Sequence, residues 1–237
     1  MAGGALYLVP GTMCDARLWT PMLKHLPGAE AHHADYTGSQ TLDAMQAKVL
    51  AQAPDEPCHL VGFSLGGYLA MMVAINHPER FKSLTVIAAS PYGLSEEEKS
   101  LRQRNAEMLS RLTYRGMSKT RLRQFIHERH MADEAITGTV LAMERDHGQD
   151  ELMRQLLAPL NRPSVTEALL SLPIPVHFIM ARNDAMVPFT AIEKFAAHAD
   201  NISLREVNDS GHMIPLEAPA ALAALVGKIC FQLPSAP

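Results

Sequence analysis

A glycine-rich turn at the end of an apolar segment is the feature that most limits how this chain folds. The apolar run 59–63 leads into G-F-S-L-G-G, residues 62–67, and a helical pattern follows directly. A serine in such a turn is forced into a strained backbone conformation, and the glycines two residues before and after it relieve the crowding. The pattern predicts a buried strand, a sharp turn that presents the hydroxyl of Ser64, and a helix.

Apolar runs of strand length alternate with helical patterns along most of the chain. We expect helices over 42–53, 65–76, 191–197 and 218–231, and six strands at 5–9, 30–35, 59–63, 84–88, 176–180 and 203–207. This alternation is typical of the α/β class. It predicts a mostly parallel six-stranded sheet flanked by helices.

The pattern changes between the fourth and fifth predicted strands. Residues 95–165 contain several short amphipathic helical patterns without a strand signal, together with 12 of the 21 Lys and Arg residues. We expect a core built from residues 1–94 and 166–237, and a helical cap inserted over residues 95–165. Solvated helix faces are one explanation of the cap's charges, and a docking face for an acidic partner is the other.

Composition excludes several classes of function. A net charge of -4 disfavours nucleic acid as a partner, and three cysteines without C-x-x-C spacing indicate neither a disulfide framework nor a zinc site. The apolar start of the chain breaks at Pro10 and Gly11, too early for a signal peptide or a membrane span. We therefore expect a cytoplasmic protein without a metal ion.

A serine nucleophile needs a base, and the base needs a third group that holds its tautomer. His212 follows the last predicted strand in D-S-G-H-M-I-P, and Asp184 follows the fifth in R-N-D-A-M-V-P. Both therefore belong at the carboxyl edge of the sheet, together with Ser64. We predict Ser64, Asp184 and His212 as catalytic residues. Asp209 is the competing acid, but it lies only three residues before His212.

Backbone amides are expected to bind the oxyanion of the reaction. The Leu65 amide falls in the first turn of the predicted helix, where N–H groups are unpaired and the helix dipole is positive. The second donor is expected in the loop after the first strand, V-P-G-T-M-C-D. We assign it to the Thr12 amide, with the Met13 amide as the alternative.

Methionine is unusually common, and the 14 Met outnumber the 13 aromatic residues. Met13, Met186 and Met213 each neighbour a predicted catalytic loop position. An adaptable apolar pocket for an acyl group is one interpretation, and gap filling in a core that is short of aromatic rings is the other.

The elbow G-F-S-L-G-G, the acid loop R-N-D-A-M-V-P, the histidine loop S-G-H-M-I-P-L-E-A-P and the helical insertion together resemble the α/β-hydrolase superfamily. The stretch from L-A-Q-A-P to N-H-P-E-R-F is similar to small esterases of the pimeloyl carrier-protein methyl esterase type. The resemblance implies a Ser-His-Asp esterase with a cap over its pocket and no cofactor. Many relatives have His-Gly where this chain has Pro10 and Gly11.

We therefore expect a carboxylic ester hydrolase that forms an acyl-enzyme on small or medium aliphatic esters. The same residues would serve a lactonase, a perhydrolase, a carbon-carbon hydrolase, or a methyl esterase for esters bound to an acyl carrier protein docked on the cap. A ligand-sensing protein with little turnover is the alternative of another class. His127, His130 and His147 are expected to be solvated cap residues rather than metal ligands.

Overall fold

Six strands form one sheet at the centre of the computed structural model, which describes residues 4–111 and 113–232. In chain order the strands are β1 (Leu6–Val9), β2 (Ala31–His33), β3 (Cys58–Phe63), β4 (Phe81–Ile87), β5 (Val176–Ala181) and β6 (Ile202–Val207). Their spatial order is β2-β1-β3-β4-β5-β6, and every neighbouring pair is parallel. The predicted six-stranded parallel sheet is confirmed.

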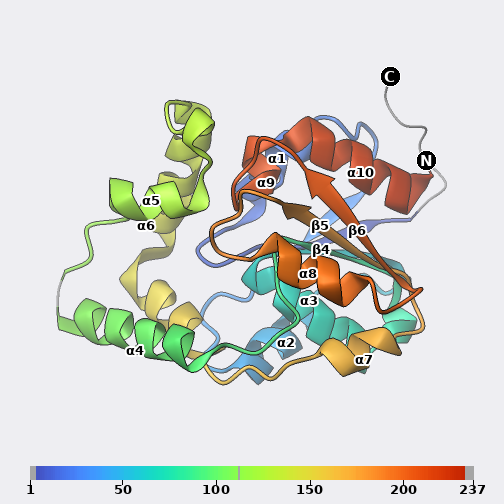
Figure 1. Ribbon diagram of the computed structural model, residues 1–237, viewed down its shortest axis with the longest axis horizontal. Helices are drawn as coiled ribbons and strands as arrows, with labels where there is room; N and C mark the ends of the chain where they lie inside the picture. The colour runs from blue at the N-terminus through green and yellow to red at the C-terminus, as the bar shows by residue number, and fades with distance from the viewer. Residues whose placement is uncertain (1–3, 112, 233–237) are drawn as a thin grey trace.

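Helices cover both faces of the sheet (Figure 1). The first face is covered by α2 (Leu42–Ala51), α3 (Leu65–Asn76), α7 (Thr166–Leu170) and α8 (Phe189–Ala196). The second face is covered by α1 (Thr20–Leu23), α9 (Ile214–Glu217) and α10 (Pro219–Phe231). Short 3-10 helices complete this part of the fold, η1 (Ala16–Leu18) and η2 (Pro78–Arg80). Within the described ranges, no helix combines the length and the apolar character needed to cross a bilayer.

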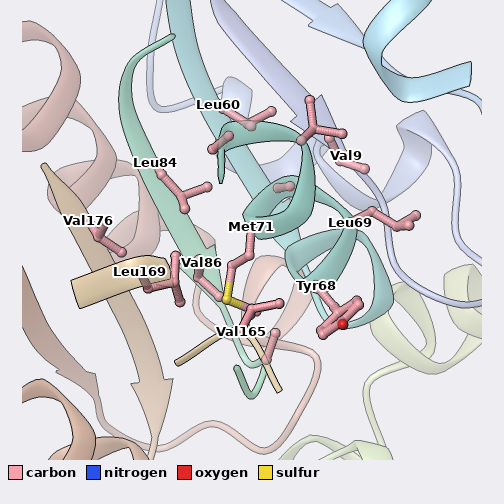
Figure 2. Close-up of a cluster of buried hydrophobic side chains, with 14 of the residues drawn as sticks. Val9, Leu60, Tyr68, Leu69, Met71, Leu84, Val86, Val165, Leu169 and Val176 are labelled. Atoms are coloured by element: carbon pink, nitrogen blue, oxygen red, sulfur yellow. The ribbon is translucent and has the colours of Figure 1, made fainter. Parts of the chain in front are cut away.

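Two hydrophobic clusters lie on the two sides of the sheet. Strand β3 contributes Leu60 to the first cluster and Val61 and Phe63 to the second, because successive side chains of a strand point to opposite faces. Figure 2 shows the first cluster, where Met71 of α3 lies next to Val86 of β4. Burial on both faces explains why β3 is apolar almost without interruption.

Between β4 and β5 the chain forms a helical segment that stands to one side of the sheet (Figure 1). The segment, residues 96–157, contains α4 (Glu96–Arg111), α5 (Lys119–Phe125), η3 (Glu128–His130) and α6 (Glu134–Leu157). Helix α6 is kinked at Gly148, whose φ of 74° and ψ of -179° are not helical. The predicted division into core and cap remains a proposal.

Candidate active site

The turn between β3 and α3 holds Ser64 at a positive φ that residues with a Cβ rarely adopt, with φ of 52° and ψ of -120°. Its amide donates to the Ile87 carbonyl at 2.9 Å, which ties the turn to β4. A Cβ on Gly62 would lie 2.5 Å from the Gly66 carbonyl oxygen, and one on Gly66 would lie 2.1 Å from that of Pro10. Glycine is therefore required at both positions, as the sequence pattern indicates.

Ser64, His212 and Asp184 lie in one chain of hydrogen bonds. The Nε2 of His212 is 3.0 Å from Ser64 Oγ, and its Nδ1 is 2.9 Å from Asp184 Oδ2. Asp184 and His212 are both buried. The other carboxylate oxygen of Asp184 accepts the amides of Met186 at 2.7 Å and Val187 at 3.1 Å. The carboxylate is therefore fixed at both oxygens, with one of them directed at the imidazole.

The loop that carries His212 is held from two sides. The His212 amide donates to the Phe125 carbonyl of α5 at 2.8 Å. The buried carboxylate of Glu217 accepts the amides of Gly211 and Met213, one on each side of the histidine, at 3.0 to 3.1 Å. It also accepts the amide of His127 at 2.7 Å. Sequence reasoning missed Glu217, because its role depends on where the loop folds.

Asp209 lies away from this chain of hydrogen bonds. Its exposed carboxylate forms an ion pair with Arg129 at 2.6 Å, and its carbonyl is 2.9 Å from Nε2 of His130. Asp184, and not Asp209, is therefore the carboxylate that contacts His212.

The two segments predicted to bind an oxyanion are close together, because Gly66 packs against the carbonyls of Val9 and Pro10. Leu65 is the first residue of α3. The Met13 amide donates to the side-chain oxygen of Gln155 in α6 at 2.8 Å, so it is already engaged. The amides of Thr12 and Leu65 have no hydrogen-bond acceptor within the described part of the chain. The role of Gln155 was not predicted from the sequence, because it lies 142 residues from Met13 along the chain.

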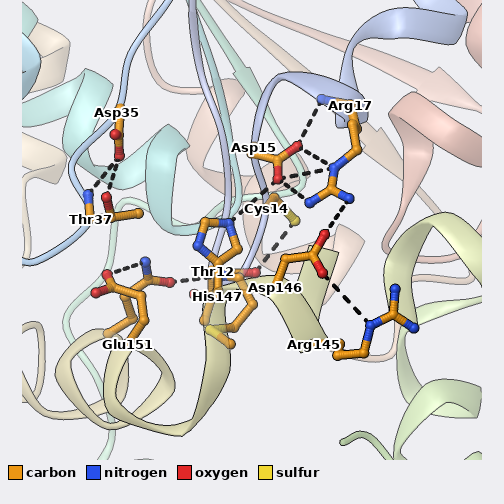
Figure 3. A network of polar contacts seen from close by, with 12 residues as sticks. Thr12, Cys14, Asp15, Arg17, Asp35, Thr37, Arg145, Asp146, His147 and Glu151 are labelled. Atoms are coloured by element: carbon orange, nitrogen blue, oxygen red, sulfur yellow. Dashed lines mark hydrogen bonds and ion pairs between the residues drawn. The ribbon is translucent and has the colours of Figure 1, made fainter. Parts of the chain in front are cut away.

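Charged side chains lie around the loop that follows β1 (Figure 3). Arg17 binds Asp15 at 2.6 Å and Asp146 of α6 at 2.7 Å. Burial raises the pKa of the Asp15 carboxyl, but the hydrogen bonds from Arg17 outweigh it and hold that pKa below its ordinary value. A cavity of about 270 Å³ adjoins the network, and its lining includes Asp15, His147 and Gln155.

The three methionines proposed for the acyl pocket differ in environment. Met13 and Met213 are buried, and Met213 belongs to the second hydrophobic cluster. Met186 is 38% exposed. Core packing therefore accounts for Met213, and contact of any of the three with an acyl group remains a prediction.

The three histidines of the helical segment do not gather in one place. The rings of His127 and His130 are 6.3 Å apart, whereas Nε2 of His147 lies 3.7 Å from Asp15. The His147 side chain is only 14% exposed and its Nε2 is buried, so the expectation that this histidine is solvated is wrong. Within residues 4–111 and 113–232, no group of three or more His, Cys, Asp or Glu side chains is arranged to hold a metal ion. All three cysteines are buried as free thiols.

Two proteins with related sequences are methyl ester esterases by name. The pimeloyl-(acyl-carrier protein) methyl ester esterase of Aliivibrio salmonicida is 26% identical over 87% of this chain and 85% of its own length. The protein of the same name from Klebsiella pneumoniae is 29% identical, over 77% of this chain and 76% of its own.

Solved structures share the fold at lower identity. An esterase from Thermogutta terrifontis superposes with a TM-score of 0.87 and 21% identity, over 97% of this chain and 90% of its own. The enol-lactonase of Burkholderia xenovorans superposes with a TM-score of 0.79 and 14% identity, over 95% of this chain and 90% of its own. The model of the alpha/beta hydrolase fold matches residues 24–219. With that match over most of its length, the chain belongs to the alpha/beta hydrolase fold family.

Proposed function

We propose that the protein is a serine hydrolase that cleaves carboxylic esters through an acyl-enzyme. The observation that carries the proposal is the continuous chain of hydrogen bonds from Ser64 through His212 to Asp184. A serine hydroxyl becomes a competent nucleophile when such a base takes its proton. The sequence similarity to methyl ester esterases supports the choice of an ester as substrate.

The reaction has two steps. His212 takes the proton of Ser64 as Oγ attacks the ester carbonyl, and the amides of Thr12 and Leu65 donate to the oxyanion. Collapse of the tetrahedral intermediate breaks the bond to the alkoxy group, which leaves as an alcohol with the proton from His212. Water then attacks the acyl-enzyme with the same base, and the carboxylic acid is released. Asp184 holds the imidazole and stabilises its charged form.

Small or medium aliphatic esters are the proposed substrates, and the helical segment is the proposed cap. A second candidate is an ester bound to an acyl carrier protein, because the related esterases act on such a substrate by name. The helical segment offers exposed cations for an acidic carrier, among them Arg111, Arg115 and Arg123. Hydrolysis that weakens with salt for carrier-bound esters, but not for free esters, would favour this candidate.

Replacing Ser64 with alanine tests the function directly. Ser64→Ala is expected to abolish hydrolysis of p-nitrophenyl butyrate and labelling by a fluorophosphonate. Ser83→Ala is the matched control, because Ser83 Oγ also contacts a histidine, His59, at 2.7 Å, in the buried part of the sheet. That variant should keep both properties. Hydrolysis retained by a folded Ser64→Ala would overturn the proposal, and a lactone in parallel tests the lactonase alternative.

Turnover separates an enzyme from a ligand-sensing protein. An esterase acting on its own substrate class is expected to reach about 1 per second or more. A wild-type protein that is labelled at Ser64 but turns over no ester or lactone in the panel would favour the sensing alternative.

A further inference from the structure

Three arginines come together where the helical segment meets the core, and their guanidinium groups are partly removed from solvent. They are Arg102 of α4, Arg121 of α5 and Arg162, between α6 and α7. Arg17, Arg129, Arg154 and Arg182 each bind a carboxylate at 2.6 to 2.9 Å. Within the described part of the chain, none of Arg102, Arg121 and Arg162 forms an ion pair.

Two of the three guanidinium groups lie on aromatic rings instead. The Cζ of Arg162 is 4.6 Å from the centre of the Tyr68 ring, and that of Arg121 is 4.8 Å from the centre of the Phe125 ring. The Nε of Arg162 is buried without a hydrogen-bond partner. A guanidinium has five N–H groups, and stacking on a ring leaves its edge open to an acceptor. One N–H group of Arg121, on Nη1, already donates to Gln124 Oε1 at 2.8 Å.

Arg102 is close enough to each of the other two arginines for their charges to interact. Burial, and then the charge of Arg102, lower the pKa of Arg162 to about 10. Burial, together with the charge of Arg121, also lowers the pKa of Arg102. Arginine stays protonated at neutral pH, so the cluster keeps three like charges in a partly desolvated place. Such an arrangement is stabilised by a bound anion.

The carboxylates nearest to the cluster have other partners. Glu98 accepts the Ser95 amide at 2.8 Å at the start of α4. Glu144 accepts the Tyr114 hydroxyl at one oxygen and the Met117 amide, at 2.8 Å, at the other. The charge of Glu144 stabilises the charged form of Arg121, and that of Glu98 stabilises the charged form of Arg162. Neither carboxylate forms a direct, two-pronged ion pair with these guanidinium groups.

The two aromatic residues that carry Arg121 and Arg162 are each in contact with a proposed catalytic residue, Phe125 through its ring and Tyr68 through its backbone amide. Tyr68 lies one helical turn after Ser64, and its amide donates to the Ser64 carbonyl at 3.1 Å. The Phe125 ring is 5.8 Å from the His212 ring, between centres. Arg121 is thus one ring away from His212, and Arg162 lies on the residue whose amide binds the Ser64 carbonyl.

We propose that Arg102, Arg121 and Arg162 form a subsite for an anionic group, a carboxylate or a phosphate, at the end of the substrate remote from the ester. The inference rests on the proposed esterase function and specifies its substrate class. The substrate is then an ester with a charged end rather than a wholly aliphatic one. Arginine suits such a group, because its planar fork matches the oxygen pairs of both anions.

A pair of esters of equal length tests the subsite. Monomethyl adipate has a carboxylate where methyl heptanoate has an ethyl group, so the two differ mainly in charge. Wild-type kcat/KM is expected to be at least about tenfold higher for monomethyl adipate. Methyl 6-(phosphonooxy)hexanoate is the phosphate arm, and the better of the two charged esters identifies the anion. Equal or lower kcat/KM for both charged esters, relative to methyl heptanoate, would overturn the proposal.

Variants locate the effect within the cluster. Arg102→Gln and Arg162→Gln are expected to lower kcat/KM for the charged ester about tenfold and to change it less than about twofold for methyl heptanoate. Arg104→Gln is the matched control, because Arg104 is exposed on the same helix as Arg102. An equal loss in Arg104→Gln would assign the preference to long-range attraction and overturn the subsite.

Two measurements keep the test independent of variant folding and of catalysis. Adipate should inhibit wild-type hydrolysis of methyl heptanoate competitively, whereas adipamide, its uncharged diamide of the same length, should not at the same concentration. The Ser64→Ala protein should bind monomethyl adipate more tightly than methyl heptanoate by calorimetry. If Ser64→Ala remains active, the esterase mechanism fails; if it is inactive but binds both esters equally, only the subsite fails.

Discussion

The backbone amide of Met13 donates a hydrogen bond of 2.8 Å to the side-chain oxygen of Gln155, which joins the loop after β1 to α6. Gln155 is buried, and its amide group donates to Glu151 at 2.7 Å. Glu151 in turn accepts the Gly38 amide at 2.8 Å. Met13 has a φ of 56°, a conformation that costs a residue with a Cβ free energy and persists only when its surroundings hold it. Gln155 therefore fixes which amide of the loop stays available, that of Thr12.

Replacing Gln155 by the isosteric methionine should impair the proposed oxyanion site. We expect Gln155→Met to lower kcat for p-nitrophenyl butyrate about 10- to 100-fold, with a smaller change in KM, because a displaced donor weakens binding of the transition state more than of the ester. A boronic acid, which forms a tetrahedral adduct with a serine, should lose affinity by a similar factor. Steady-state kinetics and inhibition constants provide both numbers.

Gln149 supplies a matched control for this substitution. It lies in the same helix, accepts the Tyr114 amide at 2.8 Å and donates to the Leu109 carbonyl, so Gln149→Met removes similar contacts from the helical segment. The kcat of Gln149→Met should stay within about twofold of the wild-type value. Equal losses in the two variants would show that loosening of α6, and not the contact with Met13, limits the reaction.

The carboxylate of Asp184 should be needed for its charge and its acceptor atom. Asp184→Asn keeps an oxygen for the Met186 amide but can present an N–H group to His212, which disfavours the tautomer that accepts a proton from Ser64. We expect kcat to fall by about three to four powers of ten. Asp209→Asn should change kcat less than about twofold, because Asp209 binds Arg129. A larger loss of kcat in Asp209→Asn than in Asp184→Asn would contradict the assignment of Asp184 as the acid that holds His212.

Features that depend on residues close together along the chain were predictable from the sequence. The glycines around Ser64, the apolar run of β3 and the helix Leu65–Asn76 are local patterns, and the order of the strands places Asp184 and His212 at the same edge. Helices α1 and α9 were missed because four residues make one turn, which is too short to show a period.

The groups that hold the site in place were not predictable. Gln155 and Glu217 act through backbone amides brought to them by tertiary packing, and a backbone amide has no sequence signature. The position of Arg162 was not predictable either, because its contact with the Tyr68 ring and its buried, unpaired Nε both depend on tertiary packing. In the sequence these residues are ordinary polar members of helices and loops.

Two glycine-to-alanine substitutions should have opposite effects. A Cβ on Gly66 would meet the Pro10 and Val9 carbonyl oxygens at 2.1 and 2.4 Å, so Gly66→Ala must displace the loop that carries Thr12. We expect a loss of about 1–3 kcal/mol or more in the free energy of unfolding, and a large loss of kcat. Gly138 in α6 has open space around its Cβ position, and Gly138→Ala should stabilise the protein by about 0.5–1 kcal/mol. Urea unfolding measures both, and stabilisation by Gly66→Ala would contradict the tight contact.

Stability should fall as the pH is lowered through the range of histidine titration, and His177 is one cause. Burial, and then the charge of Arg205, lowers the pKa of His177, whose Nδ1 is 2.7 Å from Ser203 Oγ across β5 and β6. The folded protein therefore favours the neutral imidazole. Above the unfolded pKa of about 6.5 neither state is protonated, and this contribution is complete. Below it the unfolded chain binds a proton that the folded chain takes up only at lower pH, so the contribution is lost.

Urea unfolding at pH 7.5 and pH 5.5 measures this loss. His177→Gln should reduce the difference in unfolding free energy between the two pH values, because glutamine does not titrate. His25→Gln, a change of the same kind at an exposed position, should leave the difference near its wild-type size. His33, whose pKa burial and the charge of His32 also lower, accounts for part of the remainder. If His177→Gln keeps the whole difference, burial of this imidazole does not contribute to the pH dependence, and other groups must carry it.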